Sequence, residues 1–216
     1  MNFVTSWSGG KDSCYAMMKA IKQGLVPKVL LNMMNENGKV SRSHGLPLSI
    51  LNQQARKMRL PLEAVPATWG DYEGKFIETL KKLKANFDLE VAVFGDIDLQ
   101  AHKDWEDKVC EAASIKAILP LWQQDRITLV NEMIESGIET MIVSCNTTMG
   151  ESYLGKILTK ELALELGEKG IDPCGENGEF HTLVINCPLF SEPIELPKFT
   201  TKTHNDYCFV VWEEFS

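Results

Sequence analysis

The stretch that decides the fold is Phe3-Val4-Thr5-Ser6-Trp7-Ser8-Gly9-Gly10-Lys11-Asp12-Ser13. It begins as a short apolar strand, passes through two adjacent glycines and continues into a helical period with apolar side chains at Tyr15, Met18 and Ile21. Glycine lets the backbone approach a ligand closely, and the first turn of a helix presents unpaired N–H groups and a partial positive charge. The order of strand, glycine turn and helix therefore predicts an oxyanion site over residues 8–13.

The side chains of this loop suit a phosphate group. Lys11 supplies a positive charge, Ser8 and Ser13 supply hydroxyl donors, and Asp12 is a candidate ligand for Mg²⁺, directly or through water. The spacing is neither that of a Walker A loop nor that of the Gly-x-Gly-x-x-Gly dinucleotide turn. A plain glycine turn is the alternative, but the whole hexapeptide favours a nucleotide-phosphate site made by Ser8, Gly9, Gly10, Lys11, Asp12 and Ser13.

Short β-rich runs alternate with helical periods along the rest of the first two thirds of the chain. Strands are predicted near residues 2–6, 28–32, 63–66, 90–94, 117–119 and 139–144, and helices near residues 48–58, 72–83, 104–113 and 128–134. Alternation of this kind is typical of β-α units around a parallel sheet. We predict a doubly wound, Rossmann-like α/β domain over residues 1–146.

The pattern changes after residue 146. A helix is predicted near residues 155–166, a segment rich in Gly, Pro, Glu and Asp covers residues 167–179, and β-like segments follow at 182–186 and 207–212. We predict a smaller C-terminal α+β subdomain over residues 147–216, on the substrate side of the site.

Composition narrows the class of protein. The chain has 216 residues, with 30 acidic and 22 basic side chains and a net charge of −8, so we expect no nucleic-acid partner. Apolar runs fall well short of the roughly 20 residues that cross a bilayer, and the N-terminus lacks a secretion signal, so we expect a cytoplasmic protein that does not contact a membrane. The six cysteines form no Cys-x-x-Cys pair, which disfavours a disulfide framework or structural zinc.

A second dense group of polar residues is Asp-Pro-Cys-Gly-Glu-Asn-Gly-Glu-Phe-His-Thr at residues 172–182. Glu176 and Glu179 are candidates for holding an ammonium ion or a cationic substrate, or for accepting a proton from an attacking amine. His181 is a candidate proton shuttle near neutral pH. Taken alone, the segment is equally compatible with a solvated turn capped by a hydrogen-bonded histidine.

Four further polar residues lie at or beyond predicted strand ends, where ligands bind in open parallel sheets. Asp96 follows the strand at 90–94 and is a candidate for binding substrate or Mg²⁺, with a helix-capping role as the alternative. Asn32 ends the second strand and His44 follows it, and both are candidates for the nucleotide pocket. Asn146 follows the strand at 139–144 and is a candidate substrate contact, although His44 and Asn146 also suit simple turns.

The loop at residues 8–13 resembles the Ser-Gly-Gly-x-Asp-Ser motif of the PP-loop ATP pyrophosphatase superfamily, which cleaves ATP between the α and β phosphates. Together with Phe-Gly-Asp-Ile at 94–97, Trp-Glu-Asp-Lys-Val-Cys at 105–110, Leu-Pro-Leu-Trp at 119–122 and the segment at 172–182, it resembles the diphthine–ammonia ligase family. The resemblance covers essentially the whole chain. Enzymes of that family adenylate the carboxylate of diphthine, a modified histidine of elongation factor 2, and ammonia then displaces AMP to form an amide.

The resemblance implies ATP and Mg²⁺ as cofactors, ammonia and a carboxylate acceptor as substrates, and leaves a homodimer open. It implies that residues 8–13 grip ATP and that the segment from Gly175 to Thr182 lines the acyl or ammonia side. Taking the resemblance and the residue positions together, we expect the catalytic residues to be Lys11, Asp12, Glu176, Glu179 and His181, the metal ligands to be Asp12 and Asp96, and the substrate-binding residues to be Asp96, Asn146, Gly175, Glu176, Asn177, Gly178, Glu179 and Thr182.

One segment departs from the family pattern. Members that act on elongation factor 2 commonly carry an Asp-Ser-Tyr-Met-Tyr-like sequence after the second strand, whereas this chain has Val-Ser-Arg-Ser-His-Gly at residues 40–45. That sequence resembles the bacterial branch, and bacteria do not make diphthamide. The resemblance therefore predicts the chemistry more closely than the acyl substrate.

The leading hypothesis is an ATP-dependent amide-forming ligase. Sulfur transfer to tRNA, performed by other PP-loop proteins, is one alternative, but it calls for a reactive cysteine and a basic RNA-binding face. A non-catalytic adenine-nucleotide sensor is the other, and the group of acidic residues and histidine at 176–181 argues against it.

Overall fold

A computed structural model of the chain describes residues 1–213. Its first unit is a parallel sheet with strand order β3-β2-β1-β4-β5. The strands are β1 (Asn2–Ser6), β2 (Val26–Met34), β3 (Leu62–Pro66), β4 (Val91–Val93) and β5 (Lys116–Ile118). The chain builds the sheet outward from β1 in one direction and then, through β4, in the other. The predicted doubly wound α/β fold is confirmed.

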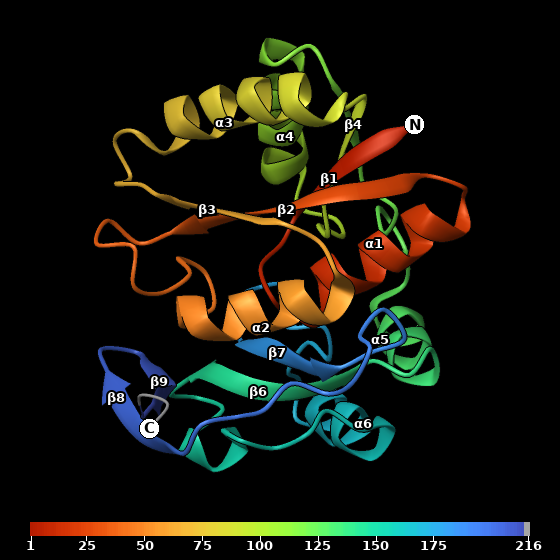
Figure 1. Cartoon of the computed structure of the whole chain (residues 1–216). Coiled ribbons are helices and arrows are strands. Elements are labelled where there is room, and N and C mark those ends of the chain that lie inside the picture. Colours follow the sequence, from red (N-terminus) through yellow and green to blue (C-terminus); the bar gives the residue numbers. More distant parts are fainter. Residues whose placement is uncertain (214–216) are drawn as a thin grey trace.

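Helices cover both faces of this sheet. They are α1 (Lys11–Lys22), α2 (Leu48–Met58), α3 (Tyr72–Phe87) and α4 (Gln100–Ala112), followed by α5 (Arg126–Glu135). In Figure 1, α3 and α4 lie on one side of the sheet and α1 and α2 on the other. Neighbouring residues of β1 explain this arrangement, because Phe3 packs into one hydrophobic core and Val4 into the other. A strand with two buried faces reads as a continuous apolar run rather than an alternating one.

A second, antiparallel sheet has strand order β7-β6-β9-β8. Its strands are β6 (Glu139–Asn146), β7 (Phe180–Asn186), β8 (Phe199–His204) and β9 (Tyr207–Trp212). The placement of the strand at 139–144 in the parallel sheet is wrong, since β6 pairs antiparallel with β7 and β9. The sequence of residues 140–145, which are all buried, has the apolar pattern of a central parallel strand. The prediction was wrong because a buried antiparallel strand has the same pattern.

Two other elements of this unit differ from expectation. The helix predicted at 155–166 begins later, as α6 (Lys160–Glu168), where the Thr159 side chain accepts a hydrogen bond from Leu162 N at 3.2 Å. The residues before it form a short 3-10 helix, η1 (Glu151–Tyr153), and an isolated bridge between Ile157 and Met141. β8 went unpredicted because all of its residues are exposed and give no alternation of apolar and polar side chains.

The boundary after residue 146 stays a prediction. β6 ends at that residue and belongs to the second sheet, which favours a division earlier in the chain, between β5 and β6.

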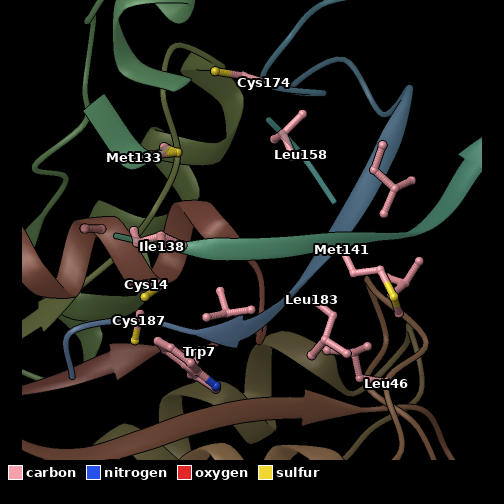
Figure 2. Close-up of a cluster of buried hydrophobic side chains, with 14 of the residues drawn as sticks. Trp7, Cys14, Leu46, Met133, Ile138, Met141, Leu158, Cys174, Leu183 and Cys187 are labelled. Atoms are coloured by element: carbon pink, nitrogen blue, oxygen red, sulfur yellow. The ribbon is translucent and has the colours of Figure 1, made fainter. Parts of the chain in front are cut away.

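One hydrophobic core joins the two sheets. Figure 2 shows side chains from both units in it, including Trp7 beyond β1, Leu46 before α2, Met141 on β6 and Leu183 on β7. The six cysteines are free and buried, as small core residues commonly are. Within residues 1–213, no helix has the length and apolar character needed to cross a bilayer.

Candidate active site

A cavity of about 1050 Å³ opens at the carboxyl ends of β1 and β4, where the strand order of the parallel sheet reverses. The loop after β1, the loop after β4 and the segment at 172–182 all reach it. The predicted site residues that line it are Ser8, Lys11, Asp12, Ser13, His44, Asp96, Gly175, Glu176, Asn177, Gly178, His181 and Thr182.

The loop between β1 and α1 is held by contacts among its own residues. Ser8 Oγ accepts a hydrogen bond from Gly10 N at 3.2 Å and lies 3.1 Å from Ser13 Oγ. Gly9 has a φ of +86°, a conformation that L side chains rarely adopt. A Cβ on Gly10 would collide with the imidazole of His44. Both glycines are therefore required by geometry, and they lie beneath the cavity rather than in its wall.

Lys11 is 3% exposed, and two hydrogen bonds hold its ammonium group. Nζ lies 2.9 Å from Asp12 Oδ2 and donates a hydrogen bond to the carbonyl of Cys174. Burial opposes the charged form, but Asp12, Cys174 and Glu176 outweigh it and raise the pKa of Lys11 above 10.5. Lys11 is thus a permanent positive charge that ties the phosphate loop to the segment at 172–182.

Strand β7 contacts the same loop from the other side. Thr182 Oγ1 accepts a hydrogen bond from Lys11 N at 3.2 Å, and Val184 N donates to Gly9 O at 2.8 Å. The buried amide of Gln54 donates to Gly9 O at 3.0 Å and to Val184 O at 2.8 Å. The phosphate loop is therefore hydrogen-bonded to the second sheet.

Two histidines lie against each other beside this contact. The ring centroids of His44 and His181 are 4.7 Å apart, and His44 Nδ1 lies 2.7 Å from Thr182 O. Burial lowers the pKa of His44 to about 4 and that of His181 to about 3, with Lys11 adding to both effects. Both rings are neutral at physiological pH, so the pKa of His181 does not favour the proton shuttling near neutral pH that was expected of it.

Glu176 has the acid–base properties of a proton acceptor. Its Oε1 accepts a hydrogen bond from Ile97 N at 3.0 Å, which fixes the carboxylate against the loop after β4. Burial, together with the charges of Asp12 and Asp96, raises the pKa of Glu176 to about 7. A carboxyl group with such a pKa exchanges a proton readily near neutral pH.

An arginine that no sequence motif indicated holds Glu176 in place. Arg126, the first residue of α5, makes two bonds to the carboxylate of Asp98, at 2.9 and 2.6 Å, and one to Asp172 Oδ2 at 2.6 Å. Asp172 Oδ2 also accepts a hydrogen bond from Glu176 N at 2.9 Å. We call Arg126, Asp98 and Asp172 the arginine clamp. It joins the loop after β4 to the segment that carries Glu176.

The loop after β4 and helix α4 contribute a second group of ionisable side chains to the cavity wall. Asp96 Oδ1 lies 2.6 Å from His102 Nδ1, and the carboxyl groups of Asp96 and Glu106 are in hydrogen-bond contact. Burial and Asp96 raise the pKa of Glu106 to about 11, so Glu106 is protonated at neutral pH. Burial opposes ionisation of Asp96, but His102 and Glu106 outweigh it and lower the pKa of Asp96. Glu106 is only 3% exposed, and its Oε2 has no hydrogen-bond partner.

Comparison with known proteins agrees with this geometry. The model of the diphthamide synthase N-terminal domain matches residues 1–117, and that of the diphthamide synthase C-terminal domain matches residues 125–215. This chain belongs to the diphthamide synthase family.

Two diphthine–ammonia ligases are similar to nearly the whole chain. The diphthine–ammonia ligase of Danio rerio is 28% identical over 97% of this chain and 91% of that protein. The diphthine–ammonia ligase of Homo sapiens is 28% identical over 94% of this chain and 85% of that protein. Among solved structures, a predicted subunit of tRNA methyltransferase from Methanocaldococcus jannaschii covers 90% of this chain and 100% of its own, with a TM-score of 0.45 at 16% identity.

Five of the predicted site residues of this diphthamide synthase family member lie outside the cavity wall. Gly9 and Gly10 shape the loop, as described above. Asn32 is buried, and its Nδ2 donates to Trp7 O at 2.6 Å, so it supports the loop from below. Asn146 Oδ1 accepts from Met149 N at 2.8 Å in a turn. The carboxylate of Glu179 accepts from both the backbone and side-chain nitrogens of Asn177 at 3.1 Å, which closes a local turn.

Sequence reasoning missed the aromatic side of the cavity. Trp69 and Trp105, thirty-six positions apart in the sequence, both contact Tyr72, with ring centroids 5.9 and 5.7 Å away. All three line the cavity. Glu106 and Arg126 were missed as well, the first because it lies on a helix and the second because its partners, Asp98 and Asp172, are distant in the sequence. The Trp-Glu pair at 105–106, in a segment that carried the family resemblance, was the available signal for Glu106.

The two candidate metal ligands, Asp12 and Asp96, differ in whether their carboxylate oxygens are already bonded to other side chains. Asp12 Oδ1 is buried without a partner and belongs to a cavity residue, while Asp96 is engaged by His102 and Glu106. Within residues 1–213, no three His, Cys, Asp or Glu side chains are grouped as a metal site. Mg²⁺ at nucleotide sites is commonly held by one or two carboxylates together with phosphates and water. Asp12 fits that pattern.

Proposed function

We propose that this chain is an ATP-dependent ligase that adenylates a carboxylate, with release of pyrophosphate, and then converts it to an amide with ammonia. One observation carries the proposal. The phosphate loop with Lys11 and the carboxylate of Glu176, whose pKa is about 7, line the same cavity. The family membership and the names of the similar proteins agree with it.

The phosphate loop would serve the first half of the reaction. A carboxylate oxygen of the acceptor attacks the α-phosphorus of ATP, and the bond to the bridging oxygen breaks to release pyrophosphate. Lys11 and the hydroxyls of Ser8 and Ser13 stabilise the negative charge that develops on the leaving group. Asp12 would hold Mg²⁺, which supplies further charge stabilisation when bound. We do not assign Asp96 to this ion, because His102 and Glu106 already engage it.

Glu176 would serve the second half. Ammonia forms a bond to the carbonyl carbon as the bond to AMP breaks, and the nitrogen must lose protons to become a neutral amide. Glu176 accepts a proton, because its pKa places it close to half ionised at neutral pH. The arginine clamp and the Ile97 N–H keep the carboxylate in place. We assign this step to Glu176 rather than Glu179, whose carboxylate closes a local turn.

The acceptor would be diphthine in elongation factor 2 or a carboxylate of similar chemistry. The names of the similar proteins favour a diphthine-type acceptor, and the segment at 40–45 is where a different acceptor would be accommodated. We further propose that the protein works in the cytoplasm, where elongation factors act, and that a homodimer is to be tested by its mass in solution.

The alternative of sulfur transfer is not favoured. Cys174 is the one cysteine in the described cavity wall, and burial raises its pKa to about 12, which keeps it a thiol. A nucleotide sensor is also less favoured, since it has no use for a proton acceptor in the nucleotide cavity.

The test is pyrophosphate release from Mg-ATP, measured with and without ammonium and with diphthine-bearing elongation factor 2 or a fractionated cell extract as acceptor. We expect pyrophosphate and AMP in equal amounts, dependent on both ammonium and acceptor, and lost in Ser8→Ala. Release of inorganic phosphate would contradict adenylation. Binding of ATP with no turnover under any condition would favour the sensor.

A further inference from the structure

We propose that Trp69, Tyr72 and Trp105, which we call the aromatic wall, bind a quaternary ammonium group of the acyl substrate. This inference rests on the proposed ligase function, since it assigns a binding site for one group of the carboxylate acceptor. It concerns the side of the cavity that neither the phosphate loop nor Glu176 uses.

The aromatic wall is built on the two helices that cover one face of the parallel sheet. Trp69 precedes α3, Tyr72 is the first residue of α3 and Trp105 lies on α4. Behind them, one turn further along α3, Phe76 is 2% exposed, and its ring centroid lies 6.3 Å from that of Tyr72 and 5.0 Å from that of Trp105. The buried core therefore supports the two inner rings, while Trp69, which is 78% exposed, still lines the cavity.

The arrangement of the rings suits a rounded cation. The plane of Tyr72 is inclined by 31° to that of Trp69 and by 45° to that of Trp105, so the three rings do not form one flat surface for stacking. The face of an aromatic ring attracts a cation that lies within about 6 Å of its centroid. Arg42 already makes such a contact, since its guanidinium carbon lies 4.5 Å from the centroid of Trp69, and Arg42 does not line the cavity. Arg42 thus holds Trp69 from outside the cavity wall.

The charge of the cavity is a second, independent observation. The acidic side chains that line it are Asp12, Glu73, Asp96, Glu106 and Glu176. Within residues 1–213, Lys11 is the one lysine or arginine in the wall, and Asp12 and the carbonyl of Cys174 hold its ammonium group. Bound ATP would add further negative charge. A carboxylate acceptor that carries a positive group would meet less repulsion on entering this cavity.

The hydrogen bonds beside the rings favour a cation without N–H groups. Glu73, the carboxylate next to Tyr72, accepts from Trp105 Nε1 at 3.0 Å on Oε2 and from Lys108 Nζ at 2.6 Å on Oε1. Both of its oxygens are therefore already bonded. A primary ammonium group has three N–H donors to satisfy, whereas a quaternary ammonium group has none and needs only aromatic faces and negative charge nearby.

The experiment measures binding of a quaternary ammonium probe, choline, without turnover. NMR saturation transfer from the full chain to the N-methyl protons of choline is titrated at pH 7, with sodium chloride keeping the ionic strength constant. A parallel series uses the uncharged isostere in which a tert-butyl group replaces the trimethylammonium group. We expect choline to bind saturably and the isostere to bind roughly tenfold more weakly, because it lacks the charge that the rings attract.

The exposed ring gives the informative variant. In Trp69→Leu the Kd for choline should rise roughly two- to thirtyfold, the fold-change that corresponds to one cation–aromatic contact. Trp69→Phe, which keeps an aromatic face, should recover most of the affinity. Trp212→Leu is the matched control and should keep the wild-type Kd, because Trp212 pairs with Phe199 at 5.7 Å and does not line the cavity.

The proposal is overturned if the isostere binds as tightly as choline, if Trp69→Leu leaves the Kd for choline unchanged, or if Trp212→Leu weakens binding as much. It is also overturned if Trp69→Leu weakens ATP binding as strongly as choline binding, because the rings would then be a surface for the adenine base. The choline titration contains no ATP and no acceptor, so a failed ligase assay and a failed subsite are told apart.

Discussion

The two loops that meet at the cavity differ in where their functional groups obtain their geometry. The loop at residues 8–13 takes its shape from hydrogen bonds among Ser8, Gly10 and Ser13, all within six positions of one another, and strand β7 and Gln54 then join it to the second sheet. The segment at 172–182 depends on distant partners, since Glu176 is fixed by a backbone N–H 79 positions away and Asp172 by Arg126, 46 positions away. The first loop was therefore readable from its own sequence, whereas the second acquires its chemistry only in the folded chain.

The largest effect is expected where the two loops join, at Lys11. Lys11→Met removes both the charge at the phosphates and the bond to the carbonyl of Cys174. We expect acceptor-dependent pyrophosphate release to fall by about 10³-fold, the upper range for loss of one stabilising charge. Lys19→Met, on the same helix but ion-paired with Glu132, should lose less than about threefold, because Lys19 does not line the cavity. A loss below tenfold in Lys11→Met would separate Lys11 from catalysis.

The next effect compares two carboxylates within the segment at 172–182. Glu176→Gln should reduce amide formation by about 10²-fold, the usual contribution of a general base, while Glu179→Gln should cost about tenfold at most. The wild-type rate should rise between pH 6 and 8, because Glu176 accepts a proton only when ionised and its pKa is about 7. When the concentration of un-ionised ammonia is held constant across the pH series, that rise should disappear in Glu176→Gln and persist in Glu179→Gln. The reverse result would return the catalytic role to Glu179.

A smaller effect is expected when the arginine clamp is broken. Arg126→Gln leaves Asp172, whose side chain is 7% exposed, without its partner, at a cost of about 1–3 kcal/mol in unfolding free energy. The rate should fall roughly tenfold, because Glu176 is displaced while no reacting group is lost. The apparent pKa of the pH–rate profile should move as well, because Arg126 holds the backbone of Glu176 through Asp172. Arg126→Lys should recover part of the rate, and an unchanged pH profile in Arg126→Gln would contradict a positioning role.

The smallest effect concerns the pH dependence of stability at the β7 side of the loop. Burial lowers the pKa of His44 from 6.5 to about 4, so the unfolded chain takes up a proton at a pH where the folded chain does not. The contribution of His44 to the free energy of unfolding is therefore fully present above pH 6.5 and is lost as the pH falls toward 4. Denaturant titrations at pH 7 and pH 5 should show a smaller loss in His44→Gln than in the wild type, by on the order of 1–2 kcal/mol. Equal losses would mean that the His44 ring is solvated.

The fold divides in the same way into parts with local sequence signals, which could be predicted, and parts that depend on distant contacts, which could not. The parallel sheet and the phosphate loop were predictable, because each β-α unit carries its own strand, turn and helix signals. β6 was given the wrong partners, since a central strand with buried residues looks alike in a parallel or an antiparallel sheet. β8, with every side chain exposed, had no apolar pattern to find.

The same reasoning applies to the candidate site. Most of the predicted residues line the cavity, and the segment at 172–182 was recognisable by its density of polar groups. The contribution of Glu106 could not be predicted, because it depends on contact with Asp96 ten positions earlier, across a turn and part of a helix. Arg126 could not be predicted either, since its partners Asp98 and Asp172 come from different units of the fold.

The hydrogen bonds from β7 to the phosphate loop have a consequence for how the chain can be divided. Gly9 O accepts from Val184 N and Gln54 Nε2, and Lys11 N donates to Thr182. A fragment ending after β5 would keep the motif and Gln54 but lose Thr182 and Val184, along with the core residues of Figure 2 contributed by β6 and β7. The two halves are therefore expected to unfold in a single transition. They should regain nucleotide binding only when the separated fragments are recombined, as in a split protein.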